Sequence, residues 1–294
     1  MDSTNTMSSE KPKSKKKTKS DKAPRPQKSS RGPKVSPRPL VLVTGEGRLL
    51  RETVSALLAG PYDLAVIQSK DAASEDEIPS SVKRFVRPDK RAHLVIDVTL
   101  ADRAEKQRSL RALDRTYGPE TLILTNAIAI PITEQASWIS GKHRLLGAGF
   151  LPGFIDRPMI EIAPSAMTLT STVNAARVFF ASIGKTPEIV QDRAGLVSAR
   201  IICQIINEAA FALQDDIAGP EDIDTSMKLG VSYPHGPFEW AEKIGIDTVV
   251  AVLHALHAEY QEERYRVAPL LNRMALGGVW WTSPTTSAHV GEAS

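Results

Sequence analysis

Two glycines that follow an apolar run could bind a dinucleotide. The run Pro39–Thr44 is typical of a buried strand, and it leads into Gly45-Glu46-Gly47 and then a segment with helical periodicity. In such a strand, turn and helix the glycines let the backbone turn tightly and approach a pyrophosphate at the helix N-terminus. Gly45 and Gly47 are therefore candidate cofactor-binding residues.

The remainder of the dinucleotide pattern is incomplete. The third glycine, which allows close packing of helix on strand, is replaced by Leu50. The second strand usually ends in an acid that binds the adenosine ribose, and here it ends in Gln68, whose amide can accept a hydrogen bond but lacks the charge. Two interpretations stay open: NAD binds with Gly45, Gly47 and Gln68, or the glycines only reverse the chain.

Short buried strands alternate with helical segments in the first half of the chain. Beyond the first strand, further strands are expected at 64–68, 94–98, 121–124, near 145–150, at 159–162 and at 189–190, with helices after Gly47 and over 101–117 and 168–183. This alternation predicts an α/β fold with a Rossmann-like, doubly wound parallel sheet. The residues after 192 contain helical periodicity alone, with helices expected over 196–213, from Pro220, over 238–243 and 246–264, and near 270–274.

Several segments resemble the 3-hydroxyacyl-CoA dehydrogenases, which oxidise the 3-hydroxyl of an acyl-CoA with NAD. The segments that carry the resemblance are His93–Val98, Leu124–Thr133, Leu146–Leu151, Met159–Ile162, Asp192–Arg200, Asn207–Ala210, Pro220–Asp224 and Tyr233–Phe238. The resemblance implies a shortened NAD-binding-type domain at 39–191 and an all-α dimerisation domain at 192–281. The tail at 1–38 and the stub at 282–294 are expected to be disordered or frayed, and the chain is expected to form a homodimer.

The residues that should do the chemistry of this family are mostly absent. In the family a histidine takes the hydroxyl proton, a glutamate orients its imidazole, and a serine and an asparagine complete the site. The resemblance places Gly149 at the histidine, Ile128 at the serine, Ala199 at the asparagine and Glu161 at the glutamate. Glu161 is therefore the one catalytic position that is retained, although a carboxylate there could also cap a helix or pair with Arg200.

Among the other positions of the family, some cofactor-side residues are retained and one is replaced. Lys106 and Asn126 match cofactor-side residues, whereas an acid that contacts the cofactor is replaced by Ala101. His143 and His235 are the histidines considered as a replacement base, but nothing in their spacing places either ring against a substrate, and we expect ordinary surface or turn roles.

The sequence thus supports two hypotheses. The first is a catalytically degenerate member, a pseudoenzyme that acts as a binding or regulatory homologue; a lost general base alone removes about 10²–10⁴-fold of the rate. The second is a divergent NAD-dependent oxidoreductase that acts on 3-hydroxyacyl-CoA in fatty-acid metabolism with an unrecognised base. An acyl-CoA ligand is implied by resemblance alone, and the segment 69–91 is shorter than the family's helical cover of the CoA side. No metal is expected.

Charge is concentrated at the N-terminus. Residues 1–38 carry a net charge of +9 while the whole chain carries +3, so the remainder is negative. Such a lysine-rich, apolar-poor tail could tether the chain to nucleic acid or an acidic partner. It could also simply improve solubility, which the lack of interleaved aromatic residues favours.

The composition indicates a cytoplasmic protein. Cys203 is the single cysteine, so no internal disulfide can form. No apolar run approaches the ~20 residues that span a bilayer, and the start of the chain lacks the apolar core of a signal peptide. We therefore expect no membrane association.

Overall fold

The first half of the chain forms one eight-stranded sheet. The structure, a computed structural model, describes residues 38–67, 78–85, 91–100, 103–153 and 157–278. Within these residues the strand order is β3-β2-β1-β4-β5-β6-β7-β8. The strands are β1 (Leu40–Thr44), β2 (Asp63–Ile67), β3 (Lys83–Phe85), β4 (Leu94–Asp97), β5 (Leu122–Asn126), β6 (Leu145–Ala148), β7 (Met159–Ala163) and β8 (Thr186–Ile189).

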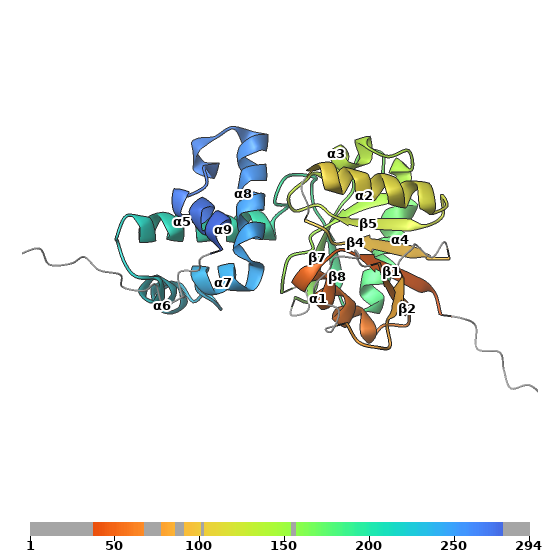
Figure 1. Ribbon diagram of the computed structural model, residues 1–294, viewed down its shortest axis with the longest axis horizontal. Coiled ribbons are helices and arrows are strands. Elements are labelled where there is room, and N and C mark those ends of the chain that lie inside the picture. The colour runs from red at the N-terminus through yellow and green to blue at the C-terminus, as the bar shows by residue number, and fades with distance from the viewer. Residues whose placement is uncertain (1–37, 68–77, 86–90, 101–102, 154–156, 279–294) are drawn as a thin grey trace, which may run out of the picture. The chain divides into compact units, whose positions relative to one another are not determined.

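Helices cover both faces of this sheet because successive strand residues point to opposite sides. Val41 and Val43 pack in the apolar cluster that holds α1 (Gly47–Leu58) and α4 (Thr170–Ser182). Leu40 and Leu42 pack instead in the cluster that holds α2 (Arg103–Thr116) and α3 (Ile132–Ser137). Figure 1 shows α2 and α3 together on one side of the sheet. The arrangement confirms the expected doubly wound, Rossmann-like fold.

One strand pair departs from the expected parallel arrangement. β7 runs antiparallel to β6, whereas every other neighbouring pair is parallel. Parallel strands need a crossover of about a dozen residues or more. The connection Gly149–Pro158 is too short to carry a helix back across the sheet, so the chain reverses. This reversal places Gly149 and Glu161 on adjacent strands, with the Gly149 N–H donating to the Glu161 carbonyl over 2.9 Å.

The second half of the chain is helical. Its α-helices are α5 (Ser198–Gln214), α6 (Pro220–Gly230), α7 (Pro237–Ile244), α8 (Ile246–Tyr260) and α9 (Pro269–Gly277). Three of them begin at a proline, whose missing N–H costs nothing in the first turn. Asp224 of α6 accepts hydrogen bonds from the Phe238 and Glu239 N–H groups, at 2.9 and 3.1 Å, and so caps α7.

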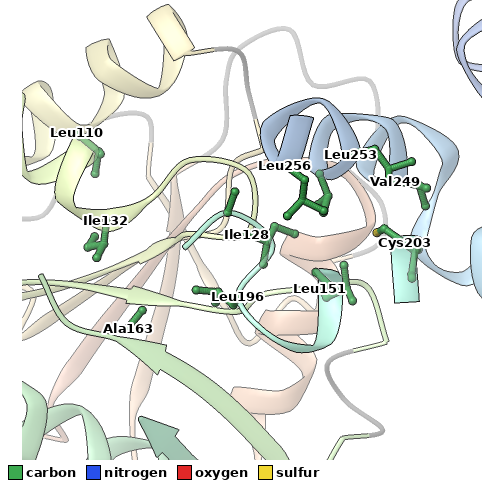
Figure 2. Packing of buried hydrophobic residues seen from close by; sticks show 14 of the residues in the cluster. Leu110, Ile128, Ile132, Leu151, Ala163, Leu196, Cys203, Val249, Leu253 and Leu256 are labelled. Carbon is green, nitrogen blue, oxygen red and sulfur yellow. The ribbon is translucent and has the colours of Figure 1, made fainter. Parts of the chain in front are cut away.

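The two halves share an apolar core. A single buried cluster includes Ile128 and Leu151 from the loops after β5 and β6, Leu196 from the connection to α5, and Leu253 and Leu256 of α8 (Figure 2). The helices therefore pack on the loops at one edge of the sheet. None of the described helices has both the length and the apolar character needed to cross a membrane.

The sequence missed or misplaced a few elements. Neither the edge strand β3 nor the short helix α3 was expected. The helix expected over 246–264 ends at Tyr260, because Gln261 adopts a left-handed conformation with φ of 53°. The lysine-rich tail, Gln68, Ala101 and the C-terminal stub lie outside the described residues.

The connection between β4 and α2 depends on a buried ion pair. The Lys106 Nζ lies 2.9 Å from Asp97 Oδ2, and both side chains are fully buried. Lys106 also donates to the Thr99 carbonyl, at 2.9 Å, and to its hydroxyl, at 3.2 Å. Burial lowers the pKa of Lys106, and the charge of Asp97 opposes that shift.

We predict that Lys106→Met destabilises the fold, because Asp97 is left as a buried charge without its cation. Breaking such a pair costs about 3–5 kcal/mol. Urea unfolding followed by circular dichroism would measure this loss. The exposed Lys83 provides the control, since Lys83→Met should change the free energy of unfolding by less than about 0.5 kcal/mol. Equal stability of Lys106→Met and the parent chain would contradict the assignment.

Candidate functional site

One cavity brings together all four positions that the sequence assigned to catalysis. The cavity has a volume of about 440 Å³ and is lined by Ile128, Gly149, Glu161 and Ala199 among other residues. Ile128 follows β5, Gly149 follows β6, Glu161 lies on β7 and Ala199 on the first turn of α5. Residues separated by up to 71 positions therefore meet where the helical half packs on the edge of the sheet.

Gly149 directs its missing side chain toward Glu161. A Cβ built on Gly149 would lie 3.5 Å from Glu161 Oε2 and 3.3 Å from Leu196 Cδ1. A larger side chain at this position would thus meet the carboxylate, as the orienting role of a glutamate requires. In this chain Leu196 occupies part of that space, and no imidazole is present at Gly149.

The Glu161 carboxylate instead holds the start of α5. It is buried, and it accepts hydrogen bonds from the Val197 N–H at 3.0 Å and the Ser198 N–H at 2.8 Å. The Ser198 hydroxyl donates a further bond to Oε1. A carboxylate at a helix N-terminus also interacts favourably with the helix dipole. Of the two structural roles considered for Glu161, the helix cap is therefore the one that the structure shows.

Arg200 is not a partner of Glu161. Its guanidinium donates to the Tyr260 hydroxyl at 2.8 Å and to the Tyr265 hydroxyl, and it stacks on both rings. These contacts tie α5 to the end of α8. Arg200 thus serves the packing of the helical half.

Three further residues line the cavity that the sequence did not single out. Arg157 precedes β7, Ser198 begins α5 and Trp240 lies on α7. Ser198 directly precedes Ala199 in the segment that resembles the family, and that position was the signal that could have singled it out. The signal for Arg157 was a single cation just before the apolar strand. Its place in the cavity wall depends on the antiparallel pairing of β6 and β7, which the sequence pattern did not reveal.

No alternative base lines the cavity. Its described lining holds no histidine, lysine or tyrosine. His143 lies before β6, where its carbonyl accepts bonds from Leu169 and Thr172. His235 lies 2.8 Å from Lys243 Nζ near the start of α7. Within the described part of the chain, the arrangement offers only Glu161 as a proton acceptor, and its oxygens already accept three bonds.

The glycine turn lies where a doubly wound sheet binds ligands, at the reversal of strand order between β1 and β4. Gly45 has φ of 145°, and a Cβ there would come within 2.6 Å of Val98 Cγ2. Gly47 has φ of 63° and opens α1, with no atom near the position of its missing Cβ. Both positions require glycine, and the turn at Gly47 faces open space.

The other predicted cofactor residues have protein partners. The three hydrogen bonds of Lys106 go to Asp97 and Thr99. The Asn126 amide donates to the Phe150 carbonyl at 2.8 Å and accepts from the Ile128 N–H at 3.3 Å. Lys106 and Asn126 therefore hold the loops beside the site, and a direct cofactor role for either stays a prediction. Gln68 lies outside the described residues. No group of His, Cys, Asp and Glu side chains suited to a metal ion occurs in the described ranges.

We predict that Glu161→Gln weakens the attachment of α5, because the amide has one acceptor and brings N–H groups toward backbone donors. Hydrogen bonds to a charged group contribute about 1.5–3 kcal/mol, so a loss of that order is expected in urea unfolding. Glu188, exposed on the neighbouring β8, is the matched control, and Glu188→Gln should be close to neutral. A Glu161→Gln variant as stable as Glu188→Gln would rule out the cap as a stabilising contact.

Comparison with known proteins supports the resemblance seen in the motifs. Residues 64–193 match the 3-hydroxyacyl-CoA dehydrogenase NAD binding domain, and residues 195–280 match the C-terminal domain of the same family. The first strand and the glycine turn precede the matched range. A probable 3-hydroxybutyryl-CoA dehydrogenase of Bacillus subtilis is 30% identical over 73% of this chain and 77% of its own length.

Solved structures show the same fold. The (S)-3-hydroxybutyryl-CoA dehydrogenase of Ralstonia eutropha has a TM-score of 0.69 and 26% identity, covering 83% of this chain and 95% of its own. FadB2 of M. tuberculosis has a TM-score of 0.71 at 22% identity, with the same coverage of both chains, and supports the fold alone. With both domain types matched and the architecture shared, this chain belongs to the 3-hydroxyacyl-CoA dehydrogenase family.

Proposed function

We propose that this chain is a catalytically degenerate member of its family that binds a ligand in the cavity without oxidising or reducing it. The observation that carries the proposal is the meeting of Ile128, Gly149 and Ala199 in one cavity with Glu161. Each of the three lacks a polar side-chain atom at a position where the family chemistry needs one. The remaining carboxylate is occupied by Val197 and Ser198.

The magnitude of the loss favours binding over turnover. A general base contributes about 10²–10⁴-fold. A preorganised donor to the developing oxyanion contributes a further factor of about 10²–10³. Without either group, hydride transfer between NADH and a 3-ketoacyl-CoA should not exceed background.

We also propose that the turn at Gly45 and Gly47 still binds NAD, and that the bound cofactor serves a binding or regulatory role. Its support is the backbone: both glycines have the conformations that a close turn needs, at the strand-order reversal of the sheet. The first turn of α1 carries Arg48 and no acid, while Glu46 lies between the two glycines as the N-cap residue. An acyl-CoA ligand is supported by the family and by the names of the relatives.

We predict that the purified chain does not consume NADH in the presence of acetoacetyl-CoA. Absorbance of NADH measures turnover, and thermal shift with NADH measures binding separately. Steady consumption above background would overturn the degenerate assignment and favour the divergent oxidoreductase. The probable 3-hydroxybutyryl-CoA dehydrogenase of B. subtilis, assayed in parallel, serves as the positive control for the assay conditions.

The same assay on restored variants tests the alignment. Gly149→His, Ile128→Ser and Ala199→Asn return the missing groups, and Ser198→Val removes the hydroxyl that donates to Glu161. The variant with all four changes should gain NADH consumption, and it should exceed the variant with the first three because Glu161 Oε1 loses one of its two donors and can accept from the imidazole. Binding of both ligands by the four-change variant without any turnover would argue against the positions assigned here.

We propose a homodimer formed through the helical half. Leu229 of α6 and Leu276 of α9 are 81% and 91% exposed, which is unusual for leucines of a small helical unit. We expect the parent chain to sediment as a dimer and the double variant Leu229→Glu, Leu276→Glu to sediment as a monomer. Val178→Glu, at a 71% exposed valine of α4, is the control and should stay dimeric. A monomeric parent chain, or a double variant that remains a dimer, would refute the proposal.

A further inference from the structure

The cavity contains two charged side chains of opposite sign that do not pair with each other. Glu161 and Arg157 both line it, yet no ion pair joins them. The Glu161 oxygens accept bonds from two backbone N–H groups and from the Ser198 hydroxyl. The carboxylate is thus committed to α5.

The Arg157 guanidinium lacks an acceptor among the described residues. None of their backbone or side-chain oxygens accepts a hydrogen bond from it, and none of their carboxylates lies within ion-pair distance. Among the described residues, Glu52 is the other acid near Arg157, but its Oε1 pairs with Arg48 Nε at 2.6 Å and its Oε2 accepts from the Gly153 N–H at 2.7 Å. Both neighbouring carboxylates therefore have other partners.

The electrostatic setting makes this cation available to a ligand. Burial lowers the pKa of Arg157, and the nearby charges of Glu161 and Glu52 oppose that shift. A guanidinium still stays protonated at neutral pH. Burial raises the pKa of Cys203 to about 12, so this thiol is neutral and supplies no counter-ion.

The rest of the lining is suited to a carbon skeleton. Apart from Arg157, Glu161 and Ser198, it consists of Ile128, Gly149, Leu151, Pro158, Met159, Ile160, Ala199, Ile202 and Trp240. A volume of about 440 Å³ lies in the range of small-molecule sites. A single planar guanidinium matches the two oxygens of one carboxylate in a bidentate pair. One cation also balances a monoanion better than a phosphate dianion.

We propose that this cavity binds a small monocarboxylate, with the ligand's carboxylate on Arg157 and its apolar body against Ile202 and Trp240. The inference rests on the proposed function, because the ligand is held where the family would carry out hydride transfer and is not turned over. Arg157 is then the residue that determines ligand class, selecting an acid over a neutral amide of the same length.

Isothermal titration calorimetry of the full chain with hexanoate and with hexanamide tests the proposal without any variant. Hexanoate should bind more tightly than the neutral amide by roughly 10- to 100-fold, the difference that charge-assisted hydrogen bonds provide. Equal affinities, or no heat from hexanoate, would overturn it. The titration contains neither NADH nor CoA. A negative titration would therefore overturn the carboxylate site alone, whereas NADH consumption would overturn the proposed function.

Variants locate the site. Arg157→Met should weaken hexanoate binding by roughly 10- to 100-fold. Arg157→Lys should lose less, because the charge remains while the bidentate geometry is lost. Arg177→Met, at an exposed arginine of α4, should bind as the parent chain does. Melting temperatures of all variants establish that they are folded. Unchanged hexanoate affinity in Arg157→Met would contradict the proposal. So would tight binding of hexanoyl-CoA with the same affinity in the parent chain and in Arg157→Met, together with no binding of hexanoate.

Discussion

The contact on which the site depends is the carboxylate of Glu161 at the N-terminus of α5. It joins the last antiparallel turn of the sheet to the first helix of the second half through bonds to Val197 and Ser198. Unpaired N–H groups at a helix start need acceptors, and a charged acceptor is the strongest kind. Ala199 and Ile202 reach the cavity wall because α5 begins at this carboxylate. The position of the cavity therefore follows from this cap.

The same contact gives the Glu161 carboxylate a structural role. A buried carboxylate needs partners, and the backbone N–H groups of Val197 and Ser198 supply two of them. The serine at 198 supplies a hydroxyl donor on the helix that Glu161 already caps. Leu196, with φ of 48°, fills part of the space beside Gly149. These contacts satisfy the Glu161 carboxylate without an imidazole at Gly149.

Most of the architecture could be predicted from the sequence because its signals are local. Buried runs such as Leu40–Thr44 and helical periods such as that of α5 indicate their own structure, and Glu161 was placed by its motif. The rest depended on tertiary context. The antiparallel turn before β7 follows from a short connection, the edge strand β3 is only half apolar, and the partners of Lys106 and Asn126 come from distant residues. Arg157 was missed for the same reason, since only that turn brings it into the cavity.

The charged residues of the cavity are suited to holding an anion but not to accepting a proton. Hydride transfer from an alcohol needs a base that can accept a proton, whereas holding an anion needs only a fixed cation. The described lining provides the second and not the first: the Glu161 oxygens already accept bonds from helix donors, and Arg157 has no acceptor among the described residues. Leaving a partly buried guanidinium without a partner is unfavourable. Packing alone would favour an uncharged side chain there, and the carboxylate ligand that we propose would supply a partner for this cation.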